Sequence, residues 1–102
     1  MTNEELSEIF ERIAELVELK GESFFIVRAY QRAARELAQL QVPAVQIAQE
    51  GRLREIPGVG DAIAKKIDEL LATGKLRFYE ELRSQFSPAV LAVVGVPGIG
   101  PK

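Results

Sequence analysis

The chain has 102 residues, enough for one small domain with a single core. It contains no Cys and no His, which excludes zinc folds, disulfide scaffolds and Cys or His catalysis, and leaves Lys, Tyr, Ser, Thr and carboxylates for any chemistry. Hydrophobic residues make up 47% and charged residues 27%, as in soluble globular domains, and no apolar run is long enough to span a bilayer. We therefore expect no membrane partner.

The formal net charge of −2 is distributed unevenly along the chain. Residues 1–22 carry seven acidic and two basic side chains, whereas residues 23–102 carry eight acidic and eleven basic ones. One surface of the second part can therefore attract an anion. The acidic start TNEE at residues 2–5 does not fit the basic start of a signal peptide, so we expect a cytoplasmic protein.

The first predicted element is a long amphipathic helix that begins after Thr2. Thr2 and Glu5 have the spacing of a capping box, and Lys20 followed by Gly21 is typical of a helix end. The apolar positions between these ends recur at helical spacing: Leu6, Ile9, Phe10, Ile13, Leu16 and Val17.

A second helix is predicted from about Ser23. Its expected buried stripe consists of Val27, Tyr30, Ala34, Leu37 and Ala38. The opposite stripe carries Arg28, Arg32 and Arg35, which form either a solvated face or a track for phosphates. Pro43 opens a short third helix that Gly51 ends.

Three more helices complete the prediction. They cover residues 61–72 with Gly74 as the cap, residues 76–85, and a short segment that starts with Ser87 as N-cap and Pro88 at the first helical position. No segment sustains the alternation of a β-strand, so the predicted fold is an all-α compact bundle of about five to six short helices.

A five-residue pattern occurs twice, as IPGVG at residues 56–60 and as VPGIG at residues 96–100. In each copy Pro and the first Gly fit a type II turn, and the second Gly lets another group approach the backbone closely. A helix follows the first copy at once. The N–H groups of Val59, Gly60 and Asp61 are therefore expected to be unpaired at its positive end and to bind an anion.

The segments on either side of the first copy make residues 45–73 resemble a helix-hairpin-helix motif, which holds a nucleic-acid phosphate through backbone amides. The simpler interpretation is a turn between two helices. If the motif binds DNA, replacing Gly58 or Gly60 should weaken binding more than folding. The second copy is followed only by Pro101 and Lys102, so we expect the chain to be a fragment of a longer protein.

Three segments in the same order resemble the amino-terminal domain of family-X (polymerase β-like) DNA polymerases of bacteria: residues 28–34 (RAYQRAA), 56–76 and 96–101. The resemblance implies a lyase-type helical DNA-binding domain over residues 1–86 and the truncated start of a second helix-hairpin-helix segment over residues 87–102. It implies a monomer that binds the 5′-phosphate side of gapped or nicked DNA in base excision repair. The nucleotidyl-transfer carboxylates and their Mg²⁺ would lie outside this chain.

The same resemblance assigns 5′-deoxyribose phosphate lyase chemistry to Lys66, which would act as a Schiff-base nucleophile. It also places Tyr30 in the pocket of the lyase site. On a helical wheel Lys66 lies at the border of the apolar face, whereas Lys65 lies almost opposite that face. Partial burial beside another cation would favour the neutral amine that the attack needs. The base could be a carboxylate, Tyr30 or water, and the chemistry needs no cofactor. Alternatively, Lys66 only extends along the edge of the core, and Tyr30 is only a core residue.

The chain departs from the resemblance where lyases of the family carry basic residues that contact the 5′-phosphate. It has Phe25, Ile26 and Ala62 at these positions. The alternative function is therefore a non-catalytic module that anchors gapped DNA for catalytic domains elsewhere in a longer protein, and a third is a protein-interaction domain.

Two further groups of residues complete the predicted site. Besides the peptide groups already named, the expected DNA contacts are Tyr30, Arg54, Gly58, Lys65, Lys75, Gly98 and Gly100. The hairpins of the family also hold Na⁺ or K⁺ through backbone carbonyls. By position, these would be the carbonyls of Arg54, Ile56 and Val59 in the first copy and of Val94, Val96 and Ile99 in the second.

Overall fold

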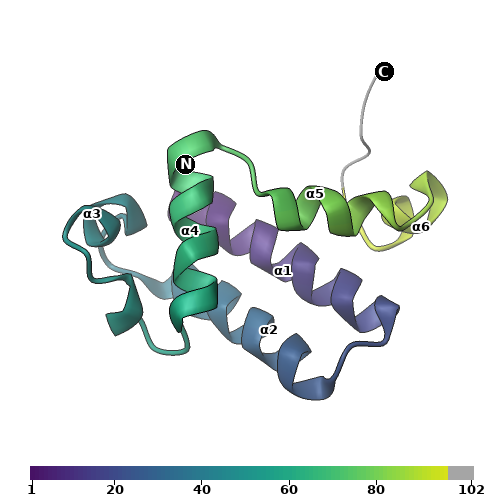
Figure 1. Cartoon of the computed structure of the whole chain (residues 1–102), viewed down its shortest axis with the longest axis horizontal. Helices are drawn as coiled ribbons and strands as arrows, with labels where there is room; N and C mark the ends of the chain where they lie inside the picture. The colour runs from purple at the N-terminus through teal and green to yellow at the C-terminus, as the bar shows by residue number, and fades with distance from the viewer. Residues whose placement is uncertain (97–102) are drawn as a thin grey trace.

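The computed structural model describes residues 1–96. All regular secondary structure in this part of the chain is helical, and it contains no strand (Figure 1). Its elements are α1 (Asn3–Lys20), α2 (Phe24–Gln39), α3 (Ala44–Gln49), the 3₁₀ turn η1 (Leu53–Glu55), α4 (Asp61–Thr73), α5 (Arg77–Ser84) and α6 (Pro88–Val93). The predicted all-α fold is confirmed. Within residues 1–96, none of these helices combines the length and the apolar character needed to cross a membrane.

Local capping signals fix several of the helix ends. Thr2 and Glu5 form the capping box at the start of α1, and Gly21 ends this helix in the left-handed conformation. Ser23 caps α2 and Ser87 caps α6, each by accepting a hydrogen bond from a backbone amide three residues later. Pro43 precedes α3 as its N-cap instead of occupying the first helical position, a shift of one residue from the prediction.

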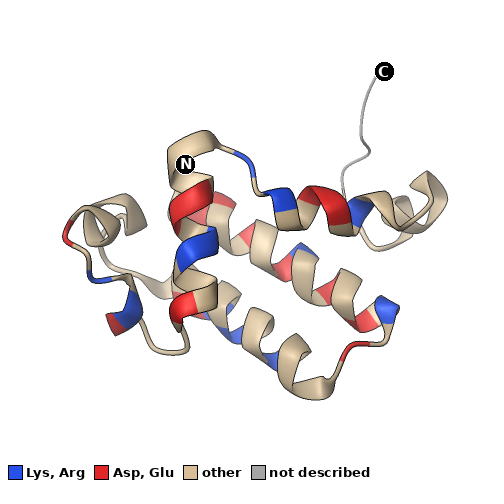
Figure 2. Cartoon of the chain, in the orientation of Figure 1, with Lys and Arg blue, Asp and Glu red and all other residues tan. Residues whose placement is uncertain are grey.

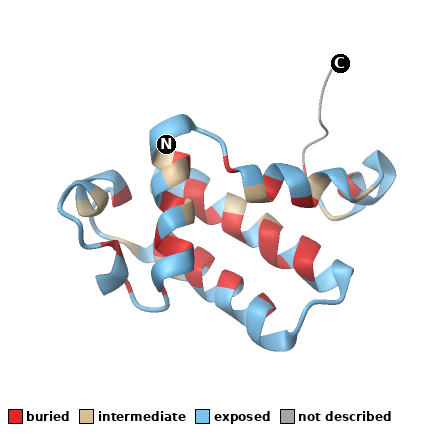
Figure 3. Ribbon diagram, in the orientation of Figure 1, coloured by how far each residue is buried: buried red, intermediate tan, exposed pale blue. Residues whose placement is uncertain are grey.

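The core lies mainly between α1 and α2, which pack side by side, and α4 crosses this pair (Figures 1 and 3). The largest fully buried side chains come from four helices and one loop: Leu6, Phe10, Ile13, Leu16, Leu37, Ile67, Leu70, Leu76 and Leu91. On α2 the buried stripe contains Ala33, whereas Ala38 is exposed, contrary to the prediction. The stripe follows the line of contact with α1, which propensity alone does not fix.

Asn3 joins the start of α1 to the start of α3. Its side-chain amide donates to the Val42 carbonyl at 2.9 Å, and its side-chain carbonyl accepts from the Ala44 amide at 2.7 Å. This pair of hydrogen bonds positions α3, the first helix of the hairpin motif. The 3₁₀ turn η1 between α3 and the hairpin was not predicted.

The second copy of the glycine pattern falls almost wholly outside the described residues. The predicted contacts Gly98 and Gly100, and the predicted carbonyl ligand Ile99, lie there. Within the described part, Gly95 has φ +77° and the Val96 amide donates to the Leu91 carbonyl, so the chain turns sharply after α6.

Candidate nucleic-acid interface

The first hairpin is a type II turn that the core holds in place. Gly58 has φ +82°, and the Val59 amide donates to the Ile56 carbonyl at 3.0 Å. The side chains of Ile56 and Val59 are both buried, at 4% and 5% exposure. The apolar residues of the pattern thus fix the turn to the core and leave its backbone at the surface.

The turn changes which amides are available to an anion. The prediction included the Val59 amide, and this part is wrong, because that N–H closes the turn. The first bond within α4 runs from the Ala64 amide to the Gly60 carbonyl, and among residues 1–96 no acceptor is found for the amides of Gly60 and Asp61. Together with the positive end of α4, these two amides form the candidate anion site.

The two glycines of the hairpin have different surroundings. A Cβ added to Gly58 would come within 2.8 Å of Cδ of Arg32, whose side chain lies across the turn, and the positive φ would be strained as well. Gly60 has φ −96°, an ordinary value, and a Cβ there would meet nothing within 4 Å. Gly58 is therefore required by the turn itself, whereas the space outside Gly60 is open to a ligand.

An ion pair stands beside the candidate anion site. The Arg54 guanidinium on η1 hydrogen-bonds the carboxylate of Asp61, the first residue of α4. This hydrogen bond is the main reason that the pKa of Asp61 lies below its ordinary value, and the positive charges of Arg54 and Lys65 contribute less. Arg54 was predicted to contact DNA, but its Nε is engaged here with a carboxylate that would repel a phosphate if left unpaired.

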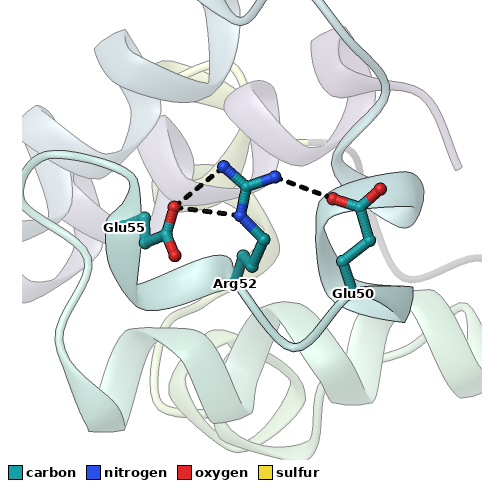
Figure 4. Close-up of polar contacts among 3 residues, drawn as sticks. All are labelled: Glu50, Arg52 and Glu55. Carbon is teal, nitrogen blue, oxygen red and sulfur yellow. Dashed lines mark hydrogen bonds and ion pairs between the residues drawn. The ribbon is translucent and has the colours of Figure 1, made fainter.

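Arg52 stabilises the loop that leads into the hairpin (Figure 4). Its guanidinium donates to Glu50 at 2.9 Å and to Glu55 at 2.9–3.0 Å. These hydrogen bonds raise the pKa of Arg52, and those to Glu55 contribute most. This cluster was not predicted, although one Arg between two Glu residues at this spacing is a usable signal in the sequence.

Lys66 lies at the end of a column of aromatic rings. Its Nζ is 4.7 Å from the centroid of the Phe78 ring, which stacks on Tyr30 at 5.9 Å, and Tyr30 stacks on Phe10 at 6.1 Å. Lys66 is half-buried and Lys65 is exposed, as the helical wheel predicted. Tyr30 is only 8% exposed, and burial, followed by the charge of Glu22, raises its pKa. Phe78, which connects the two predicted residues, was missed.

The Lys66 side chain lines a hollow of about 600 Å³ between α4 and α5. Lys65 and Arg77 line the same hollow, together with three carboxylates. Two of these are engaged, since Asp61 pairs with Arg54 and Glu69 accepts from the Arg77 amide at 2.8 Å. The carboxylate of the third, Glu81, has no partner among residues 1–96.

Tyr30 lines a second, adjacent cavity of about 710 Å³, which lies between the start of α2, the hairpin and α5. Ile26 and Ala62, which stand where basic residues were expected, line this cavity, and Phe25 is 82% exposed nearby on α2. Gly58, Gly60 and Asp61 also border it. Tyr30 is thus at once a core residue and part of a cavity wall.

The predicted cations occupy two regions. Basic residues recur along α2 (Figure 2). Arg28, Arg32 and Arg35 are exposed there and have no acidic partner in the described chain, and the Arg32 side chain lies over Gly58 of the hairpin. Lys75 follows the opposite end of α4, which has 13 residues. At 1.5 Å per residue it stands about 20 Å from Gly60. The Arg row and the hairpin therefore form one surface, to which Lys75 does not belong.

Comparison with known proteins agrees with this geometry. A family model for the helix-hairpin-helix domain matches residues 1–76, and the chain belongs to this family. The chain is also similar to the DNA polymerase/3′-5′ exonuclease PolX of Bacillus subtilis (strain 168), with 26% identity over all 102 residues. It spans 17% of the length of that relative. The resemblance to bacterial family-X polymerases is thereby confirmed.

Proposed function

We propose that this chain is a DNA-binding module that grips the sugar-phosphate backbone on the 5′-phosphate side of a gap. The observation that carries the proposal is the pair of unpartnered amides at Gly60 and Asp61, held at the positive end of α4 by a turn anchored in the core. The Arg row of α2, which meets this turn through Arg32, supplies the positive charge that a phosphate backbone requires.

Titration of affinity against salt tests this function. We expect log K to fall linearly with log salt, with a slope that corresponds to about three to five phosphate contacts. A gapped duplex with a 5′-phosphate should bind more tightly than the same duplex without a gap. A flat dependence on salt would overturn the proposal and leave only a protein-interaction domain.

A second candidate function is 5′-deoxyribose phosphate lyase activity, which the position of Lys66 favours. In this reaction Nζ adds to C1′ of the opened abasic sugar and water leaves, which gives an imine. A base then takes a proton from C2′, and the bond between C3′ and its oxygen breaks, so that the DNA keeps a 5′-phosphate. Lys66 is half-buried in the same hollow as Glu81, which suits the roles of amine and base.

Two observations favour the binding module over the lyase. Nζ of Lys66 lies over the ring of Phe78, and this contact would have to be given up for the amine to reach a sugar. With Ile26 and Ala62 in its lining, the cavity next to the lysine has Lys20 as its one cation within residues 1–96, and Lys20 is paired with Glu22.

Borohydride trapping on a 5′-incised abasic duplex decides between these functions. A covalent adduct that Lys66→Ala abolishes and Lys65→Ala retains would establish the lyase. Absence of an adduct together with intact binding to the same duplex would establish the non-catalytic module.

A further inference from the structure

The cavity beside the hairpin has the wrong chemistry for a phosphate in its interior. Its charged lining residues are Lys20, Glu22, Asp61 and Glu81. The one cation among them, within residues 1–96, is paired with Glu22 at 3.9 Å. An anion drawn inside would meet carboxylates with no free positive charge to offset them, so the interior suits an uncharged group.

Most of the remaining wall is apolar and partly aromatic, with Gln85 as its one uncharged polar side chain besides the Tyr30 hydroxyl. The larger apolar contributions come from Val17, Ile26, Tyr30, Ile63, Phe78 and Leu82. The cavity's volume of about 710 Å³ lies in the range of pockets that hold small molecules, which is about 300–1,000 Å³. Flat apolar groups gain from burial against such a wall and from contact with its rings.

The candidate anion site lies on the rim of this cavity, because Gly60 and Asp61 belong to its lining. A nucleotide whose phosphate is held by their amides therefore has its sugar and base next to the apolar interior. We propose that the cavity receives the unpaired nucleobase of the nucleotide whose phosphate the hairpin holds. This inference rests on the proposed DNA-binding function and adds a second, uncharged point of recognition to it.

The test uses the full chain and a gapped duplex that carries a 5′-phosphorylated, one-nucleotide unpaired flap. In one version the flap nucleotide is 2-aminopurine, and in the other it is a base-free tetrahydrofuran. We expect the wild-type chain to bind the version with the base about tenfold more tightly and to quench its fluorescence. Equal affinity for the two versions, or unchanged fluorescence on binding, would overturn the inference.

Ala29→Phe fills the cavity from an exposed position on α2 that is not part of the hairpin. This variant should bind the two versions of the flap with about equal affinity. Its affinity for the base-free version should remain that of the wild type. Ala38→Phe, at an exposed site on the same helix outside this cavity, should keep the preference. A preference that survives in Ala29→Phe would contradict the inference.

These outcomes are separate from those that concern the hairpin. A substitution that blocks the anion site, such as Gly60→Ser, should weaken binding of both versions of the flap equally. If the wild-type chain binds neither version, the DNA-binding function itself fails. If it binds both equally in a hairpin-dependent manner, that function stands and only the base-binding inference is wrong.

Discussion

Replacing Gly60 with Ser separates the stability of the fold from its affinity for phosphate. Gly60 is the N-cap of α4, with φ −96° and open space around the position of a Cβ. Ser is a better N-cap than Gly by a few tenths of a kcal/mol, because its hydroxyl accepts a hydrogen bond from an amide of the first turn. We therefore expect the melting temperature of Gly60→Ser to rise by about 1–2 °C.

The same substitution should weaken DNA binding. The added side chain stands where a phosphate oxygen would approach the Gly60 and Asp61 amides, and its hydroxyl competes for the first turn of α4. One hydrogen bond to a charged group contributes about 1.5–3 kcal/mol, so the Kd for gapped DNA should rise by about 10- to 150-fold. Thermal unfolding and fluorescence anisotropy with a labelled gapped duplex measure the two effects.

Two variants serve as controls. Ser87→Gly changes the N-cap of α6, far along the chain from the hairpin, and should alter stability slightly and affinity not at all. Gly58→Ala should lose about 1–2 kcal/mol of stability through strain at φ +82°, in addition to displacing Arg32. A Gly60→Ser protein that melts higher and binds gapped DNA as tightly as the wild type would refute the assignment of these amides to phosphate.

Three further predictions concern the parts that support this site. Asn3→Ala removes both hydrogen bonds between α1 and the segment that leads into α3, and should lower the free energy of unfolding by about 1–3 kcal/mol in a urea titration, whereas Gln41→Ala should have little effect. The lowered pKa of Asp61 adds stability that is fully present above its unfolded value of about 3.8 and is lost as the pH falls through the folded value. Melting temperatures measured through acid pH should therefore fall less steeply in Asp61→Asn than in the wild type. If a monovalent cation binds the hairpin carbonyls, replacing K⁺ by tetramethylammonium at constant ionic strength should weaken binding of gapped DNA, and equal affinities would contradict this site.

One of the predicted carbonyl ligands, Ile56, belongs to the type II turn. The Ile56 carbonyl accepts the Val59 amide and keeps a second lone pair for a cation. Carbonyl oxygens suit hard cations. The predicted ligand Val96 lies at the end of the described chain, where its own amide is bonded to the Leu91 carbonyl.

The features that the sequence predicted correctly depend on residues close together in the chain. The capping box of α1, the serine caps, the glycine ends at Gly21 and Gly74, and the type II turn each involve groups three to five residues apart. The half-burial of Lys66 and the exposure of Lys65 followed from the period of a single helix. Local backbone geometry restricts such features so strongly that residue type and spacing are enough to predict them.

The chemistry of the candidate site was decided by packing between segments distant in the chain. Arg32 of α2 lies over Gly58, and Phe78 of α5 stands between Lys66 and Tyr30. Neither contact leaves a trace in local spacing, because each depends on how the helices cross. The sequence thus predicted that a hairpin would offer its backbone to an anion. Only the tertiary structure decided that Arg32 lies over the turn and that the cavity beside the free amides is apolar, since burial and distant partners are properties of the assembled core.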